Sequence, residues 1–353
     1  MKVLIVGAGP AGLTTAVELA RRGIVGDIID LRESGSGLSR AVGILPASLE
    51  ILGPSGVAEK LVAEGMKFRE VRVYRNASLS LALPLKVREA DDAFILGLAQ
   101  DRTEAHLRDS FSELGGTVRY ATELVNLHQD ANKVTVDMRD GATGEYDYVI
   151  GADGAHSATR KLLNIDFRGH DLAETWSIAD VDADGWPNTN AFTICRLDQG
   201  KVVVVAPLEL GRFRVISNTE DALAVLPLKL NVTNVRRAGT FTISIRQAAQ
   251  YSVGSVFLVG DAAHCHSPVG GRGMNLGIAD GAELARRMLE GELDGYSEAR
   301  HKVGKETIAM SEGLRKIITS RNPATRALIL AFLRMASLIP VIQRQIARQF
   351  LYG

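Results

Sequence analysis

Hydrophobic and polar positions alternate along the chain in patterns that predict both helices and strands. An apolar stretch at Lys2–Val6, a helical period over Ala11–Arg22 and a second apolar stretch at Asp27–Leu31 predict a strand, a helix and a strand. This order is a β-α-β unit, the usual opening of a parallel sheet. Helical periods over Pro46–Glu64 and Asp101–Leu114 predict two more helices.

The middle of the chain has the alternation that is typical of strands. Phe68–Tyr74 and Leu79–Leu83 are expected to form a hairpin. The strands expected after it are Thr117–Tyr120, Leu124–Leu127, Val134–Met138, Tyr146–Ile150, a series from Phe192 to Ile245 that includes Val202–Ala206, and Val256–Val259. The pattern then becomes helical to the end of the chain, beginning with Leu276–Leu289.

This order of elements predicts an α/β protein with two sheets. We expect a doubly wound, Rossmann-like domain built from discontinuous segments, an inserted β-sheet domain and C-terminal helices. The predicted bounds are 1–66, 98–166 and 251–290 for the first, 67–97 and 167–250 for the second, and 291–353 for the helices. The alternative is a continuous α/β domain followed by a separate β domain.

The first of three glycine clusters, Gly7-Ala8-Gly9-Pro10-Ala11-Gly12, joins the first strand to the first helix. Gly7 permits the sharp turn, Gly9 lets the backbone approach a pyrophosphate, and Gly12 lets helix and strand pack closely. The helix N-terminus offers free N–H groups to the phosphates. Asp30, at the end of the second strand, is placed to accept hydrogen bonds from a ribose, which favours FAD or NAD over NADP. The alternative is a glycine-rich turn without a ligand.

Two further clusters follow later strands. Residues 151–160 read GADGAHSATR, which alone indicates no more than a turn. Residues 260–275 read GDAAHCHSPVGGRGMN and lead into a helix. A flavin needs a buried carboxylate for its ribityl chain, which Asp261 could supply, and N–H groups at its N1–C2=O edge, which such a helix start could supply. NAD has neither feature, so FAD is favoured. The three clusters must meet to serve one ligand, which favours the interrupted domain.

Together these clusters resemble the motifs of the FAD-dependent aromatic hydroxylases. These are single-component flavin monooxygenases of the para-hydroxybenzoate hydroxylase type, and the phenol hydroxylase and polyketide hydroxylase branch is the most similar. The resemblance runs from residue 1 to about residue 350. It implies tight, non-covalent FAD, reduction by transiently bound NAD(P)H, and O₂ as co-substrate. A C4a-hydroperoxyflavin would then hydroxylate a small or polycyclic, phenol-like aromatic substrate.

The resemblance also implies roles for individual residues. Those expected to bind FAD are Gly7, Gly9, Pro10, Ala11, Gly12, Asp30, Leu31, Arg32, Arg40, Gln100, Leu124, Asp153, Gly154, Arg160, Gly260, Asp261, Pro268, Gly270, Gly271, Gly273, Met274 and Asn275. The candidates for the substrate pocket are Tyr74, Trp176, His266, Pro268 and Arg272. Trp176 and Trp186 either stack on the substrate or fill the core of the β domain, and no residue stands out as the base that deprotonates a phenol.

The chain departs from the branch at three points. Arg272 stands where Gln is usual, which puts a cation near the expected flavin, and Ser267 replaces a frequent proline. We expect helices over 291–353 in place of the thioredoxin-like third domain of many relatives. Two other functions stay open. One is an FAD-dependent oxidoreductase of the same fold without oxygen transfer, and the other is a flavin-loaded binding protein whose C-terminal helices recruit a partner or membrane.

The composition of the chain limits which partners, metals and locations are expected. Lys and Arg together number 41, as do Asp and Glu, so no net charge attracts nucleic acid or anionic membranes. Two cysteines make no disulfide framework, which fits a reducing, cytoplasmic location. His264-Cys265-His266 lacks further ligands at metal-site spacing, so no metal is expected. Glycines interrupt the apolar start, which argues against a signal peptide. Residues 327–353 are too short and charged to cross a bilayer and are expected to pack on the body rather than on a membrane.

Overall fold

The computed structural model of the chain describes residues 1–35, 41–86 and 93–352. Its six-stranded sheet has the order β18-β19-β12-β1-β2-β8, and all neighbours are parallel except β18 and β19. The strands are β1 (Val3–Val6), β2 (Asp27–Ile29), β8 (Val118–Arg119), β12 (Tyr148–Gly151), β18 (Ser252–Val253) and β19 (Val256–Leu258). The sheet thus gathers segments far apart in sequence, as expected for a Rossmann-like domain.

Both faces of this sheet are covered, which explains why its strands are continuously apolar. On one face, Val3 and Ile5 pack under the helices α1 (Pro10–Ala20), α4 (Gln100–Glu113) and α6 (Gly273–Glu290). On the other face, Leu4 and Val6 pack against an antiparallel layer. That layer consists of β9 (Leu124–Gln129), β10 (Val134–Met138) and β11 (Thr143–Tyr146).

The second large sheet has eight strands in the order β20-β17-β13-β16-β15-β14-β5-β6. They are β5 (Glu70–Arg75), β6 (Ser78–Pro84), β13 (Phe167–Asp184), β14 (Ala191–Arg196), β15 (Val202–Glu209), β16 (Arg212–Ser217), β17 (Asn231–Ala248) and β20 (His264–Cys265). The predicted hairpin is confirmed as β5 and β6. Strand β13 was not predicted, because its sequence is largely polar; pairing with β17 along its length holds it extended.

A small sheet and short helices connect the two large sheets. The sheet has the order β3 (Gly43–Ile44), β7 (Ile95–Gly97) and β4 (Met66–Phe68), and α5 spans Ala158–Leu162. The prediction of a single helix over Pro46–Glu64 is wrong. It divides into α2 (Pro46–Leu52), the 3₁₀ turn Gly53–Ser55 and α3 (Val57–Glu64). Gly56 has a left-handed φ of 72°, which no right-handed helix can continue through.

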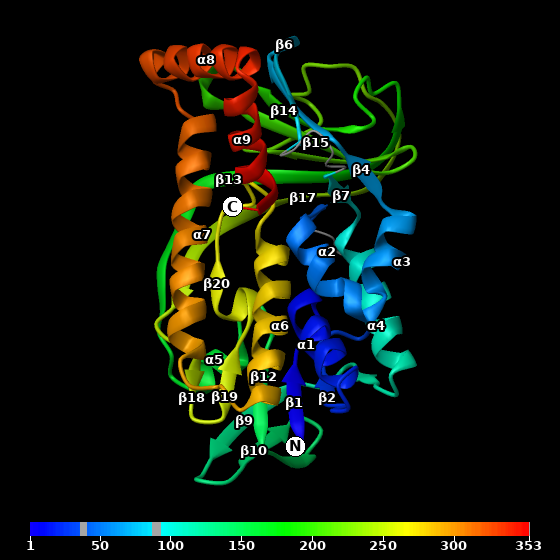
Figure 1. Cartoon of the computed structure of the whole chain (residues 1–353), viewed down its shortest axis with the longest axis vertical. Coiled ribbons are helices and arrows are strands. Elements are labelled where there is room, and N and C mark those ends of the chain that lie inside the picture. Colours follow the sequence, from blue (N-terminus) through cyan, green and yellow to red (C-terminus); the bar gives the residue numbers. More distant parts are fainter. Residues whose placement is uncertain (36–40, 87–92, 353) are drawn as a thin grey trace.

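Three helices close the chain, as expected: α7 (Tyr296–Ile318), α8 (Pro323–Leu338) and α9 (Pro340–Tyr352). Helix α7 runs along the long axis, α8 lies across one end and α9 turns back toward α6 (Figure 1). Within the described ranges, no helix is both long and apolar enough to cross a bilayer. The domain bounds stay a prediction, and β20 joins the eight-stranded sheet although residues 251–290 were assigned to the other domain.

Candidate functional site

The first and second glycine clusters touch where β1 and β12 end. A Cβ on Gly7 would lie 2.4 Å from the carbonyl oxygen of Ala152, and Gly7 has a φ of +108°. A Cβ on Gly12 would lie 2.0 Å from the carbonyl oxygen of Gly7 and 3.0 Å from the Cβ of Ala152. Atoms that close are not tolerated, so the packing of the protein itself requires glycine at both positions.

The first and third clusters also touch, through the packing of α1 on α6. A Cβ on Gly260 would lie 2.9 Å from the Cβ of Ala11, and one on Gly277 would lie 3.2 Å from it. One turn further along, a Cβ on Gly281 would lie 2.5 Å from Thr15 Oγ1. Because β1, β12 and β19 are parallel neighbours, all three clusters follow strands at the same edge of the sheet. The structure therefore brings them together.

Gly9 differs from these glycines, because the described part of the protein gives no reason for it. A Cβ there would meet no atom within 4 Å, and its φ of −81° suits any residue. Pro10 begins α1 directly after it, so the open space lies at the N-terminus of a helix, where N–H groups attract phosphate. This is the feature of the loop that fits a dinucleotide.

Asp30 and Arg32 form a bidentate ion pair beside this loop. Arg32 Nε lies 2.9 Å from Asp30 Oδ1 and Nη2 lies 2.9 Å from Oδ2, which also accepts from the backbone N–H of Ala8. Burial raises the pKa of Asp30, but these hydrogen bonds outweigh it and the net pKa is lowered. The carboxylate is therefore ionised and already bonded to the protein. Leu31, between them, is exposed.

Helix α4 continues this polar network. Glu104 Oε2 accepts from Arg32 Nη1 at 3.2 Å, and Glu104 Oε1 accepts from Gln100 Nε2 at 2.8 Å. Three predicted cofactor residues, Asp30, Arg32 and Gln100, are thus linked. Arg40 lies outside the described residues. Leu124 is buried on the opposite face of the sheet from α1, among Val6, Ile29 and their neighbours, and its predicted contact with the cofactor stays a prediction.

Arg160 links the second cluster to the third. Its guanidinium donates to the carbonyl oxygens of Ala155 at 2.7 Å and Ala262 at 2.8 Å, and it lies 3.7 Å from the ring centre of Phe167. Burial lowers its pKa. Asp153 Oδ2 accepts from the backbone N–H and the hydroxyl of Thr159, and Gly154 has a left-handed φ of 77°. These residues shape the loop from the protein side.

The third cluster forms a tight turn at the start of α6. Gly271 N donates to the carbonyl oxygen of Pro268 at 2.9 Å, and Gly270 and Gly271 have φ of +93° and +64°, where glycine is favoured. Gly273 and Met274 then begin the helix. Asp261 is exposed, not buried as we expected, because the 3₁₀ turn Gly260–Ala262 turns it outward.

Asn275 makes four hydrogen bonds within the protein. Its Oδ1 accepts from the backbone N–H of Leu45 and the hydroxyl of Ser48, and its Nδ2 donates to the carbonyl oxygens of Gly43 and Gly271, all at 2.8 Å. An amide has two donors and two acceptor positions, so every one is used. The side chain ties α6 to residues 43–48, and its predicted contact with the cofactor stays a prediction.

Asp280 was missed by the sequence analysis, although it lies at the centre of the third cluster. Its buried carboxylate accepts from the backbone N–H of Gly260 at 3.1 Å and from Arg300 Nε at 2.6 Å, and its Oδ2 lies 2.6 Å from His264 Nε2. The sequence did carry a signal. Asp280 stands between Leu276 and Leu284 on the apolar face of α6, where a carboxylate must find partners.

Two of the pocket candidates lie on opposite faces of the eight-stranded sheet. Trp176 is fully buried on the face turned to the third cluster, in a hydrophobic cluster with Val202, Ile243 and Ile245 against which Val269 packs. Tyr74 faces the other side, into a cluster with Trp186 under residues 222–230, and its hydroxyl donates to Asn188 Oδ1. The alternation of β5 sends Val73 toward α9 and Tyr74 away from it, so Tyr74 is withdrawn as a pocket candidate. Both tryptophans fill core positions.

The other pocket candidates belong to the third cluster. His266 Nδ1 lies 2.9 Å from the carbonyl oxygen of Ser267, and burial lowers the pKa of the imidazole. Arg272 points toward α9, where its Nη2 donates to the carbonyl oxygen of Gln349 at 2.5 Å, and burial lowers its pKa. Pro268 starts the turn described above. The cation thus bridges the glycine-rich turn and the C-terminal helix.

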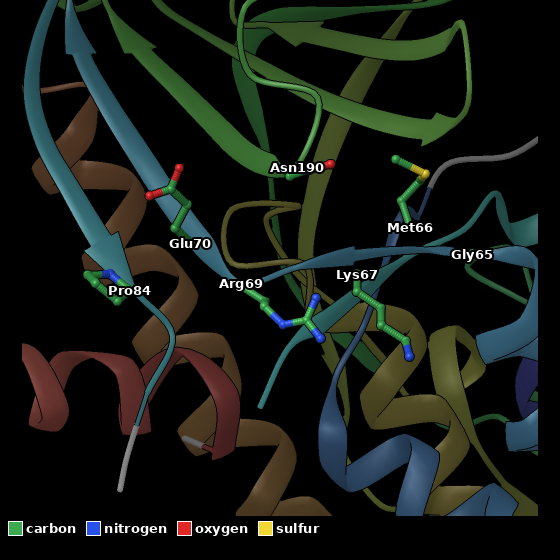
Figure 2. A pocket seen from close by; sticks show the side chains of 7 residues that line it. All are labelled: Gly65, Met66, Lys67, Arg69, Glu70, Pro84 and Asn190. Atoms are coloured by element: carbon green, nitrogen blue, oxygen red, sulfur yellow. The ribbon is translucent and has the colours of Figure 1, made fainter. Parts of the chain in front are cut away.

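A cavity of about 530 Å³ opens where β4 passes into β5. Figure 2 shows Lys67 and Arg69 pointing to one side of the chain, with Glu70 further along β5. The residues that line the cavity are Gly65, Met66, Lys67, Arg69, Glu70, Pro84 and Asn190. None of the predicted site residues lines it. Among the described residues, no group of three His, Cys, Asp or Glu side chains could hold a metal ion.

Comparisons with known proteins agree with this arrangement. The family described as an FAD binding domain matches residues 1–227 and 217–311. Rifampicin monooxygenase of Streptomyces venezuelae is 32% identical over 332 residues, which cover 87% of this chain and 69% of the relative. Pentachlorophenol 4-monooxygenase of Sphingobium chlorophenolicum is 32% identical over 347 residues, which cover 90% and 64%.

Solved structures show the same fold. p-Nitrophenol 4-monooxygenase of Pseudomonas putida matches with a TM-score of 0.88 at 24% identity, over 99% of this chain and 96% of that one. Anhydrotetracycline hydroxylase of Streptomyces rimosus matches with a TM-score of 0.79 at 29% identity, over 99% and 76%. The expectation of an α/β fold with an antiparallel sheet and C-terminal helices is confirmed.

Proposed function

The chain belongs to the FAD binding domain family of flavin-dependent aromatic monooxygenases, and from this premise we propose that it hydroxylates a phenol-like aromatic compound with NAD(P)H and O₂. The observation that carries the proposal is the convergence of three glycine clusters at one sheet edge. Gly9 adds the open space beside a helix N-terminus that a pyrophosphate needs. Pentachlorophenol and p-nitrophenol, which two relatives are named for, are both phenols.

The residues at this edge divide the work of holding FAD, which supplies the oxygen chemistry when bound. We assign the phosphates to the Gly9 loop and the start of α1, and the adenosine side to the network of Asp30 and Arg32. The exposed carboxylate of Asp261 is assigned to the ribityl hydroxyls. Backbone N–H groups at the start of α6, where Asn275 Nδ2 donates to the carbonyl oxygen of Gly271, are assigned to the flavin ring.

The substrate is assigned to the space between the glycine-rich turn and the eight-stranded sheet. Val269 of that turn already packs against the Trp176 cluster of the sheet. A buried ion pair on the same sheet has Arg214 Nη2 2.6 Å from Asp180 Oδ2. Arg214 Nη1 also donates to the carbonyl oxygen of Ala41, so this residue connects the eight-stranded sheet to the segment before β3. Such a site excludes water and orients an aromatic ring. The domain bounds predicted from sequence are retained as part of this proposal.

The test is a screen of phenols, heteroaromatics and polycyclic aromatics under ¹⁸O₂. We expect a yellow protein that consumes NADH or NADPH faster with the right compound and places one ¹⁸O atom in the product. A product without ¹⁸O would point to an oxidoreductase of the same fold. Bound FAD with no turnover would point to a binding protein. NAD(P)H consumption alone is insufficient, because uncoupled reduction of O₂ yields peroxide.

A further inference from the structure

Helix α8 carries an apolar stripe that faces solvent. Leu328, Phe332, Met335 and Leu338 recur at helical spacing along one face, and their side chains are 72%, 45%, 46% and 81% exposed. The stripe continues past the helix to Val341, which is 69% exposed. A stripe of this length on a surface helix indicates a surface that docks on something else.

Another side of α8 packs on the protein, as far as its described side chains show. Ala336 is fully buried, and the neighbours of the helix are β6 and α9. Figure 1 shows α8 lying across the end of the long axis, with the tip of the β5–β6 hairpin at the same level. Leu79, near that tip, is also exposed. The apolar stripe can therefore meet a flat surface without the body of the protein intervening.

The charge of residues 313–353 indicates which kind of surface the apolar stripe would dock on. After Glu312 the sequence contains no Asp or Glu, although the whole chain has no net charge. The basic residues of the same stretch are Arg315, Lys316, Arg321, Arg326, Arg334, Arg344 and Arg348. A long segment with basic but no acidic residues around an exposed apolar stripe is typical of helices that lie on anionic lipid.

Cations also gather at this end from the neighbouring sheet. Burial lowers the pKa of Arg196, and the positive charges of Arg326 and Arg75 lower it further. The guanidinium of Arg196 is held by the carbonyl oxygen of Ile318, and the backbone N–H of Asn76 donates to the carbonyl oxygen of Arg196. Three acids lie here: Asp198 is paired with Arg326, Glu312 forms a bidentate pair with Arg315, and Glu174 lies near Arg315. The cations outnumber them.

Contrary to the expectation from the sequence that residues 327–353 pack on the body rather than on a membrane, we propose that α8 docks this protein on an anionic membrane surface, with its apolar stripe in the headgroup boundary and the surrounding cations on the lipid phosphates. The stripe supplies burial and the charges supply selectivity for anionic lipid. A helix that lies in the interface in this way needs no membrane-spanning length. The inference is independent of the proposed reaction, because no residue of α8 belongs to the glycine-cluster site.

The test is flotation of the full chain with vesicles of phosphatidylcholine, with and without one third phosphatidylglycerol. We expect binding to the anionic vesicles that is at least about tenfold tighter than to the neutral ones and that weakens as salt screens the charges. Equal binding to both, or binding to neither, would overturn the proposal.

Three variants locate the contact. Phe332→Glu and Leu328→Glu should each reduce vesicle binding at least about tenfold. Each places a negative charge in the apolar stripe, and that charge is repelled by the anionic lipid. Leu210→Glu is the matched control, since Leu210 is 94% exposed in the turn between β15 and β16, and it should bind as the parent does. FAD content and thermal unfolding show whether each variant is folded. Lys316→Gln with Arg321→Gln should weaken binding while leaving the stripe intact.

A second copy of the chain could also cover this apolar stripe, in a dimer. Sedimentation of the lipid-free protein decides between them. A dimer that Phe332→Glu dissociates, together with no vesicle binding by the parent, would assign the stripe to self-association and overturn the membrane proposal. A monomer that floats with anionic vesicles supports it.

Discussion

His264 Nε2 and Asp280 Oδ2 lie 2.6 Å apart, and both side chains are completely buried. Arg300 bonds the other carboxylate oxygen, and the N–H of Gly260 bonds Oδ2. One carboxylate thus connects the third glycine cluster with α6 and α7. Burial works to raise the pKa of Asp280, but the charges of His264 and Arg300 and the hydrogen bonds lower it overall.

We expect Asp280→Asn to lower the free energy of unfolding by about 3–5 kcal/mol at pH 7, because it leaves the largely buried guanidinium of Arg300 without its carboxylate. A lowered pKa means that the ionised carboxylate stabilises the fold above its unfolded value of 3.8 and that this stabilisation is lost as pH falls through the lower folded value. The difference between parent and variant should therefore shrink below pH 3.8.

Urea unfolding across pH measures this prediction. Asp294→Asn, at an exposed position before α7, is the control and should change stability little at any pH. A variant as stable as the parent at pH 7 would show that the network contributes nothing to folding.

Gly9→Ala should raise the FAD dissociation constant at least about tenfold, or about 1.4 kcal/mol, because its methyl group enters the open space assigned to the pyrophosphate. The FAD-free protein should unfold as the parent does, since a Cβ there meets no protein atom. Fluorescence titration of FAD measures the first quantity. Gly239→Ala, also without close neighbours, should leave FAD affinity unchanged. Unaltered affinity in Gly9→Ala would remove the phosphates from this loop.

The contact of α1 with α6 can be tested at Gly281 of α6, with Gly313 of α7 as the matched control. Gly281→Ala should destabilise the protein by about 1–3 kcal/mol, because its Cβ would lie 2.7 Å from the carbonyl oxygen of Ala11. Gly313→Ala, in α7 with no neighbour within 4 Å, should instead stabilise by about 0.5–1 kcal/mol through helix propensity. Thermal and denaturant unfolding compare them. Effects of the same sign would contradict the packing described between α1 and α6.

Arg272→Gln should loosen α9, because the guanidinium bonds a carbonyl near the C-terminal end of that helix, where the helix dipole is negative. A charged hydrogen bond of this kind contributes about 1.5–3 kcal/mol, so hydrogen exchange over residues 343–352 should rise tenfold or more. Arg348→Gln, at an exposed position of the same helix, is the control. Unchanged exchange together with a shifted flavin reduction potential would place the cation at the ring and not at α9.

The sequence predicted the architecture well where local patterns carry it. The β-α-β opening, the hairpin β5–β6 and the helix after the third cluster follow from periodicity and glycine spacing. The break between α2 and α3 was hidden because Pro54 and Gly56 lie in a stretch whose apolar period continues on both sides. Strand β13 was hidden because a partner far along the chain, not its own composition, keeps it extended.

Individual site roles were harder to predict, since they depend on which partner a side chain meets. Asn275 stands in a flavin motif, yet its amide is taken up by Leu45, Ser48 and two glycine carbonyls. Arg272 could be read as a cation near the flavin, and only the position of α9 reveals its bond to Gln349. Such long-range partners leave no mark on the local pattern.

The contact between Ala11 and Gly260 and Gly277 also sets an order of events during synthesis. Helix α1 is made early, but the surface of α6 that closes on it leaves the ribosome only after most of the chain has been translated. Until then the N-terminal loop and α1 lack their contacts with Gly260, Gly277 and Gly281. Domains generally fold as units during translation. For this chain we expect capture of the dinucleotide to wait for the last quarter, so nascent fragments that end before residue 273 should be colourless.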